Sequence, residues 1–416
     1  MFKLSTSYWD SEDGLHSIRN RWGPLKLNKP LIVILIAFTI LSIVWNIFIP
    51  PYENLDEIEH AEVIRHIAVT GYLPIHGEAE AAGYHVRQEA SQPPLYYLVG
   101  AAWVKVLNLP TVPPEAQTIP SQVVSCGDSG TFYNKATWTR DPYNDFPLWN
   151  GHIRTIHGIR LLSTLLQLLT LIGTWNLSRK LFPQGSIPIL ATIVVAFNPQ
   201  FTLVASGVNN DNLVTPIATW AILLLVDIWQ KGPTVKKLLG YGLLSGLAAM
   251  SKLSGAALLG LASLVLIIYA VKKHTPVTHV MLWGSLIGLP ALTISAPWIL
   301  RNLQLYGDPT GLTPMLKHVG TREQPADVIG TFRLMYLSYW GQLPCSFYPQ
   351  ALYWPFLLLS GGGTALLIIK WKKFPKNQQA GLLILASWFI IIVTAWIRWN
   401  ARSEERRVGK ECRSRW

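Results

Sequence analysis

A short acidic stretch follows the first long apolar run of the sequence. Residues 54–60 read NLDEIEH and come directly after LIVILIAFTILSIVWNIFIP. Asp56, Glu57 and His60 therefore lie where a chain leaves a bilayer. Carboxylates in such a position can act as a general base on an acceptor hydroxyl group, or they can bind a divalent cation through their oxygen atoms.

Three further ionisable residues, Asp211, Lys252 and Arg301, end apolar segments elsewhere in the chain. Any one of them alone could be an interfacial charge that simply reaches water. Carboxylates can remove a proton, and Lys or Arg can stabilise a departing phosphate. The combination of acidic and basic groups therefore indicates a membrane enzyme that acts on a lipid-phosphate substrate.

The C-terminal tail differs in character from everything before it. RSEERRVGKECRSRW (402–416) is strongly polar and follows an apolar, Trp-rich segment. It resembles the in-frame translation of a common sequencing-adapter oligonucleotide, so we interpret it as non-native and exclude it from the fold. We expect the natural chain to continue past Ala401. The tail holds six Lys/Arg and three Asp/Glu, so the formal charge of +12 becomes +9 without it.

The composition is that of a membrane protein. Half of the residues are hydrophobic, only 14% are charged and 18 are Trp, whereas a soluble domain carries roughly a quarter charged residues. Apolar stretches near the length that crosses a bilayer recur along the chain, and no strand-like alternation indicates a barrel. We predict an all-α, polytopic membrane fold. The first apolar run is too long for a cleavable signal peptide, so we interpret it as a retained anchor.

We expect about nine transmembrane helices of the usual length. The candidate spans are 31–50, 156–177, 186–205, 213–230, 238–251, 255–271, 278–299, 351–369 and 379–397.

Clusters of Lys and Arg mark one end of these spans, and the positive-inside rule makes that end cytoplasmic. The N-terminal segment 1–30 is then cytoplasmic, and NLDEIEH is extracytoplasmic. The clusters are Arg19, Arg21, Lys26 and Lys29; Arg179 and Lys180; Lys231, Lys236 and Lys237; Lys272 and Lys273; and Lys370, Lys372, Lys373 and Lys376.

Within the membrane domain 31–401, residues 51–155 then form one large extracytoplasmic loop, and residues 300–350 form a later one. We expect a helix over 55–69 and a turn at Gly71–Pro74. If the apolar segment 92–108, QPPLYYLVGAAWVKVLN, crossed the bilayer, every later cluster of Lys and Arg would lie on the opposite side of the membrane. We therefore predict a helix that lies at the outer surface or dips shallowly, with Tyr96, Tyr97 and Trp103 at the membrane interface.

Several short elements occur in the order found in GT-C glycosyltransferases, which are membrane enzymes that use polyprenyl-phosphate sugars. They are L-D-E-I-E-H after the first span, then P-P-L-Y-Y, then N-P-Q-F followed by N-N-D-N. Over about residues 31–300 the sequence resembles family-39 type protein mannosyltransferases, aminoarabinose transferases and bacterial galacturonosyltransferase-like proteins. The stretch W-I-L-R-N…Y-G-D-P-T-G extends this resemblance more weakly.

The resemblance implies roles for individual residues. Asp56 matches the first-loop carboxylate that activates the acceptor, and Glu57 matches the acidic residue beside it. Asp211 matches the second-loop acidic residue, which binds metal in some relatives and shapes the pocket in others. We therefore assign these three residues to catalysis, and Asp56 and Asp211 would hold a divalent cation if one is bound.

A second group of residues is assigned to binding of the substrate or its phosphate. Some relatives place Lys or His directly before P-P-L, whereas this chain has Gln92, and Arg87 is the candidate substitute. The assigned residues are His60, Arg87, Pro93, Pro94, Tyr96, Asn210, Lys252 and Arg301. His60 follows Asp56 by four residues and could share its helix face, either as a metal ligand or as ordinary surface polarity.

The implied reaction is transfer of a sugar from a polyprenyl-phosphate donor to a hydroxyl of a protein, lipid or glycan of the cell envelope. Asp56 takes the proton, and the lipid phosphate departs toward Arg301 or Lys252. A single displacement predicts inversion at C1. No nucleotide-sugar domain is visible, which agrees with a lipid-linked donor.

Two other functions remain open at this point. A transporter or flippase of a lipid-linked substrate would need polar groups near mid-depth, whereas these lie at helix ends. A non-catalytic membrane partner would only bind through its outer loops. Cys126 and Cys345 both fall outside by this topology and could form a disulfide.

Overall fold

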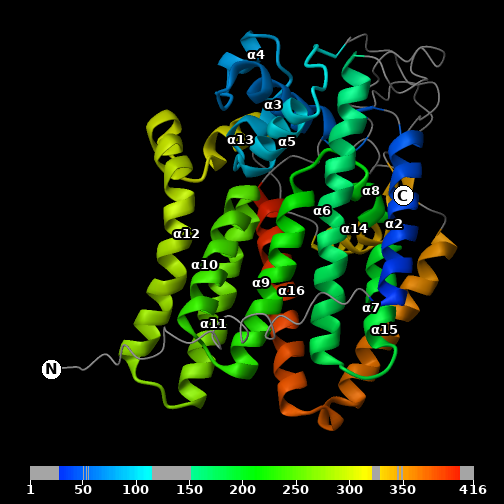
Figure 1. Cartoon of the computed structure of the whole chain (residues 1–416), viewed down its shortest axis with the longest axis vertical. Coiled ribbons are helices and arrows are strands. Elements are labelled where there is room, and N and C mark those ends of the chain that lie inside the picture. Colours follow the sequence, from blue (N-terminus) through cyan, green and yellow to red (C-terminus); the bar gives the residue numbers. More distant parts are fainter. Residues whose placement is uncertain are drawn as a thin grey trace, which may run out of the picture.

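The fold is a bundle of long helices with a small helical cap at one end (Figure 1). The computed structural model describes residues 28–49, 51–52, 54, 56–114, 151–320, 328–343, 346–347 and 350–402. Cys126, Cys345 and most of the C-terminal tail lie outside these residues. The all-α prediction is confirmed, since the only strands in the described part are the two-residue pair β1 (Gln342–Leu343) and β2 (Ser346–Phe347).

The long helices match the predicted spans closely. They are α2 (Lys29–Phe48), α6 (Gly151–Leu181), α7 (Ile187–Ala196), α8 (Pro199–Ala205), α9 (Asp211–Lys231), α10 (Val235–Ser251), α11 (Ala257–Lys272), α12 (Val277–Tyr306), α15 (Trp354–Ile369) and α16 (Lys376–Arg402).

Seven helical segments in the described part are long and apolar enough to cross a membrane, and eight are if the bent pair α7–α8 counts as one span. The bend of 61° falls where Pro199 begins a new helix, because proline cannot continue the hydrogen-bond ladder. The remaining predicted span is α10, which has 17 residues and packs between α9 and α12. The protein is thus a multi-pass membrane protein.

Close packing of α10 against α12 depends on a missing side chain. A Cβ on Gly242 would lie 2.4 Å from the carbonyl oxygen of Ile287. Small residues let two membrane helices approach in this way. This close contact fixes the position of α10 relative to α12, and Lys252 directly follows α10.

The basic ends of the helices gather at the end of the bundle opposite the cap (Figure 1). Asp227 on α9 accepts there from Lys180 of α6 and from Lys237 of α10. This arrangement is the one-sided charge distribution on which the topology prediction was based.

The cap consists of α3 (Glu57–Thr70), α4 (Glu78–Ala81), the 3-10 helix η1 (Arg87–Ser91), α5 (Leu95–Val106) and α13 (Leu312–Val319). The predicted helix over 55–69 and the turn after it are confirmed, and Gly71 ends α3 with φ 79°. At 12 residues α5 is too short to cross a bilayer. It packs on α3 through a shared apolar core.

One expectation about α5 is wrong. Tyr96 and Tyr97 were predicted to face the membrane interface, but both rings are buried inside the cap. Each phenol hydroxyl has a polar partner there, Ser163 for Tyr96 and Glu89 for Tyr97. A buried tyrosine hydroxyl usually has such a partner, and these partners come from segments that the local pattern does not reveal.

Candidate active site

Asp56 stands at the boundary between the membrane bundle and the cap. It immediately precedes α3 and adopts a left-handed backbone conformation, with φ 51° and ψ 22°. Such a conformation is uncommon outside glycine, although Asp and Asn tolerate it better than most residues. The side chain is half-buried. Strain of this kind is often kept at functional positions.

Glu57, the neighbouring acid, is completely buried and fully engaged within the protein. Its two oxygens accept from Nε and Nη2 of Arg160 at 2.8 and 2.6 Å. The backbone amides of Tyr52 and Val208 also donate to this carboxylate. Glu57 therefore joins α3 to α6 and to the loop before α9, and it fixes the position of Asp56 beside it.

Arg160 completes this junction. It lies on α6 with no exposed surface, and its Nη1 donates to the carbonyl oxygens of Asn46 and Ile49 at the end of α2. The sequence analysis missed this residue. The sequence does contain a signal for it. Arg160 lies inside the predicted span 156–177, and a charge within an apolar helix requires a partner.

Asp211 and Lys252 form the second charged element. Asp211 is the first residue of α9, where the helix dipole favours a carboxylate. The ammonium of Lys252, directly after α10, lies 2.7 Å from Oδ1 of Asp211. Both side chains are partly exposed, at 32% for Lys252 and 42% for Asp211, so the pair is open to solvent and to a ligand.

Asp56, Asp211 and Lys252 all act electrostatically on one histidine, His60. His60 is buried on the first turn of α3, and burial lowers its pKa to about 4. Asp56, Lys252 and Asp211 all contribute electrostatically at this ring. Three residues that are far apart in the sequence therefore share one electrostatic neighbourhood.

A buried polar chain leads away from His60. Its Nδ1 lies 2.9 Å from the hydroxyl of Tyr97, which in turn donates to Oε2 of Glu89 at 2.8 Å. All three side chains are nearly inaccessible. Burial, together with the negative charge of Asp56, raises the pKa of Glu89 well above its usual value. Tyr97 and Glu89 were not assigned from the sequence.

The P-P-L element holds the loop before α9 in place. Pro93 and Pro94 are buried at the start of α5. Gln92 accepts from Nδ2 of Asn210, so the residue directly before P-P-L binds the N-N-D-N loop. The hydroxyl of Tyr96 accepts from the backbone amide of Asn209. The first and second outer loops are thus joined.

Asn210 has an unusual environment. The residue is fully buried, and its Oδ1 has no hydrogen-bond partner among the described residues. A buried amide oxygen without a partner is costly. It therefore indicates a donor that binds there, either water or a substrate hydroxyl.

The two predicted arginines have partners within the protein. Arg87 is largely exposed and lies 3.4 Å from the buried carboxylate of Glu59. Nη2 of Arg301 donates to the backbone carbonyl of Pro74 at 2.7 Å. Arg301 therefore attaches α12 to the turn after α3, and its assignment to phosphate binding stays a prediction.

A metal ion in a protein is held by a group of ligating side chains. No group of three or more His, Cys, Asp or Glu side chains within this part of the chain is arranged to hold an ion. Asp211 is already paired with Lys252. That Asp56 and Asp211 hold a divalent cation stays a prediction.

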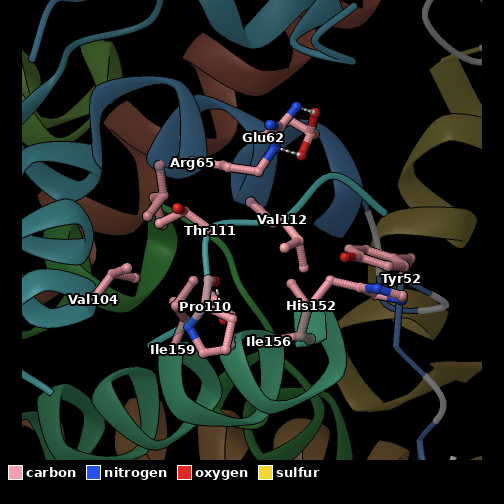
Figure 2. A pocket seen from close by; sticks show the side chains of 13 residues that line it. Tyr52, Glu62, Arg65, Val104, Pro110, Thr111, Val112, His152, Ile156 and Ile159 are labelled. Atoms are coloured by element: carbon pink, nitrogen blue, oxygen red, sulfur yellow. Dashed lines mark hydrogen bonds and ion pairs between the residues drawn. The ribbon is translucent and has the colours of Figure 1, made fainter. Parts of the chain in front are cut away.

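A small cavity lies on another face of α3 and is separate from this site (Figure 2). Its volume is about 20 Å³, which is room for a single water molecule. The Glu62–Arg65 ion pair forms one wall, and Tyr52 stacks on His152 at the other side. The cavity is too small to bind a sugar.

Comparison with known proteins finds one family that matches the middle of the chain. Residues 152–300, which run from α6 to α12, match the family model described as dolichyl-phosphate-mannose-protein mannosyltransferase. Over these residues, about a third of the chain, the sequence is similar to that family of GT-C type membrane glycosyltransferases. No curated protein and no solved structure matches the chain. The matched region includes Asp211 and Lys252, whereas Asp56 and the cap helices lie outside it.

Proposed function

We propose that the glycosyltransferase moves a sugar from a polyprenyl-phosphate donor to an acceptor hydroxyl on the extracytoplasmic face, with inversion at C1. The observation that carries this proposal is the gathering of Asp56, Asp211 and Lys252 at the cap end of the bundle, opposite the basic helix ends. That end is extracytoplasmic if the positive-inside rule holds.

The chemistry follows from these charges. The carboxylate of Asp56 takes the proton of the acceptor hydroxyl while the hydroxyl oxygen forms a bond to C1 of the sugar. The bond between C1 and the phosphate oxygen breaks, and its electron pair stays on the phosphate. Lys252 stabilises that added negative charge, and Arg301 can contribute the donors that it does not use on Pro74.

A lipid-linked donor agrees with the membrane surface below the site. A groove of about 310 Å³ lies between α10 and α12 and is lined mainly by Leu239, Leu243, Leu286, Leu289, Pro290 and Ile294. Lys252 follows Leu243 by nine residues, roughly 13 Å along the helix axis, so a prenyl chain that extends from this groove along α10 can place its phosphate at Lys252.

The test uses proteoliposomes that contain a polyprenyl-phosphate sugar labelled in the sugar, with candidate acceptors in the outer solution. Transfer of the label to an acceptor, with the anomeric configuration at C1 inverted, is the expected result. A transporter would move labelled lipid between the leaflets and leave the sugar attached to it. Retention of configuration, or movement of the intact lipid alone, would reject the proposal.

A further inference from the structure

The hydrogen bonds around His60 define which of its nitrogens carries the proton. The hydroxyl of Tyr97 has one proton, and it donates that proton to Oε2 of Glu89. Its oxygen can then only accept from His60, whose Nδ1 lies 2.9 Å away. While Oε2 of Glu89 accepts from Tyr97, Nδ1 carries the hydrogen, and Nε2 is left with a lone pair.

The ring is neutral in this arrangement. His60 is buried, and burial lowers its pKa to about 4, so the imidazole is uncharged at neutral pH. The titratable groups around it are Asp56 directly before α3, Glu89 on η1, Tyr97 on α5, Asp211 on α9 and Lys252 after α10.

Nε2 has no hydrogen-bond partner in the part of the chain that the structure describes. His60 is one turn after Asp56, and its backbone amide donates to the carbonyl oxygen of Asp56. A neutral nitrogen with a lone pair accepts a hydrogen bond from a hydroxyl group, whereas it repels the oxygens of a phosphate.

We propose that Nε2 of His60 binds the acceptor hydroxyl beside Asp56, and that Tyr97 and Glu89 are positioning residues that hold the ring in the required tautomer. This inference rests on the proposed glycosyl transfer. It divides the site into an acceptor side, formed by Asp56 and His60, and a phosphate side at Lys252.

The kinetic test compares His60→Asn with His66→Asn. Asn keeps a side-chain amide near Nδ1, so it can still donate to Tyr97, but it has no atom at the position of Nε2. Loss of one neutral hydrogen bond should raise the acceptor KM about tenfold. The donor KM and the affinity for inorganic phosphate should stay within about twofold. His66, on the same helix and bonded to the backbone of Tyr72, is the matched control.

Tyr97→Phe tests the positioning role. Nδ1 of His60 lies 3.4 Å from Oε2 of Glu89, so the carboxylate can replace part of the lost contact. The acceptor KM should therefore rise less than in His60→Asn. An unchanged acceptor KM in folded His60→Asn, or a weaker affinity for phosphate or donor instead, would overturn the inference.

A second measurement does not depend on activity or on the variants. Nitrogen-15 chemical shifts of His60 in the wild-type protein distinguish the two neutral tautomers from the imidazolium. The neutral form protonated at Nδ1 is expected at pH 7. A proton on Nε2, or a charged ring, would overturn the inference even if transfer is observed. If wild-type protein transfers no sugar, the proposed function fails, and the tautomer still reports on His60.

Discussion

The ammonium of Lys252 lies 2.7 Å from Oδ1 of Asp211, although the two residues are 41 positions apart in the sequence. The contact joins the start of α9 to the end of α10 at the cap end of the bundle. It leaves each side chain about a third or more exposed. Solvent screening makes such a pair a weak source of stability. We therefore expect the two charges to act mainly on a bound ligand.

Replacing Lys252 should therefore separate activity from stability. Lys252→Met removes the cation that faces the leaving phosphate, and loss of a single such group costs about a hundredfold or more in kcat. The free energy of unfolding should change by less than about 1 kcal/mol. Lys105→Met, at an exposed position on α5, is the control. Equal kcat values for the two variants would contradict the role of Lys252.

The Glu57–Arg160 pair should behave in the opposite way. Both side chains are fully buried, and removal of one partner leaves an uncompensated charge, at a cost of about 3–5 kcal/mol. Glu57→Gln should lower the thermal midpoint strongly, whereas Glu78→Gln on the exposed surface of α4 should not. A midpoint for Glu57→Gln equal to that of the parent would show that this junction does not hold α3 on the bundle.

The turn after α10 offers a test of geometry. A Cβ on Gly255 would lie 2.3 Å from the backbone of Ala248, so Gly255→Ala must displace the turn that carries Lys252. We expect a loss of both stability and kcat, while Gly260→Ala, which has open space for a Cβ on α11, should behave like the parent. Full activity in Gly255→Ala would mean that the position of Lys252 is not critical.

The stability of the protein should depend on pH through His60. The unfolded chain has a histidine pKa near 6.5, whereas the folded value is about 4. Between these values the unfolded state binds more protons, so this contribution is fully present above pH 6.5 and is lost as the pH falls to 4. Its full size is about 3 kcal/mol.

Glu89 makes a contribution to stability with the opposite pH dependence. Its pKa is raised in the folded state, so its contribution is lost as the pH increases. The difference in thermal midpoint between the parent and His60→Asn isolates the histidine contribution. The thermal midpoint of the parent should fall relative to that of His60→Asn as the pH decreases from 6.5 to 4. A difference that is constant over this range would contradict a buried, neutral His60.

The long elements of this fold could be predicted because they follow from composition alone. A run of some twenty apolar residues must cross the bilayer as a helix, and the basic clusters determine its direction. The short length of α5 and the helix after Asp56 were also readable from local pattern and charge. Asp56 and Asp211 stood out because they follow or begin apolar helices.

The pairings within the site could not be predicted, because they join segments that are distant in the sequence. Nothing near Glu57 indicates that Arg160 is its partner, and nothing in P-P-L-Y-Y indicates that Tyr97 faces Glu89 and His60. Two adjacent acids looked equivalent in the sequence. The backbone amides and the guanidinium around Glu57 give it a supporting position, while Asp56 remains nearer the surface.

Asp56→Asn is the variant that tests the central assignment most directly. Asn keeps the size of the side chain and tolerates the left-handed backbone at this position, so the fold should persist while the base is lost. With a saturating labelled polyprenyl-phosphate sugar, kcat should fall by about 10²- to 10⁴-fold, with little change in donor affinity and none in Glu78→Gln. A folded Asp56→Asn protein that transfers sugar at the parent rate would contradict Asp56 as the proton acceptor and, with it, the mechanism.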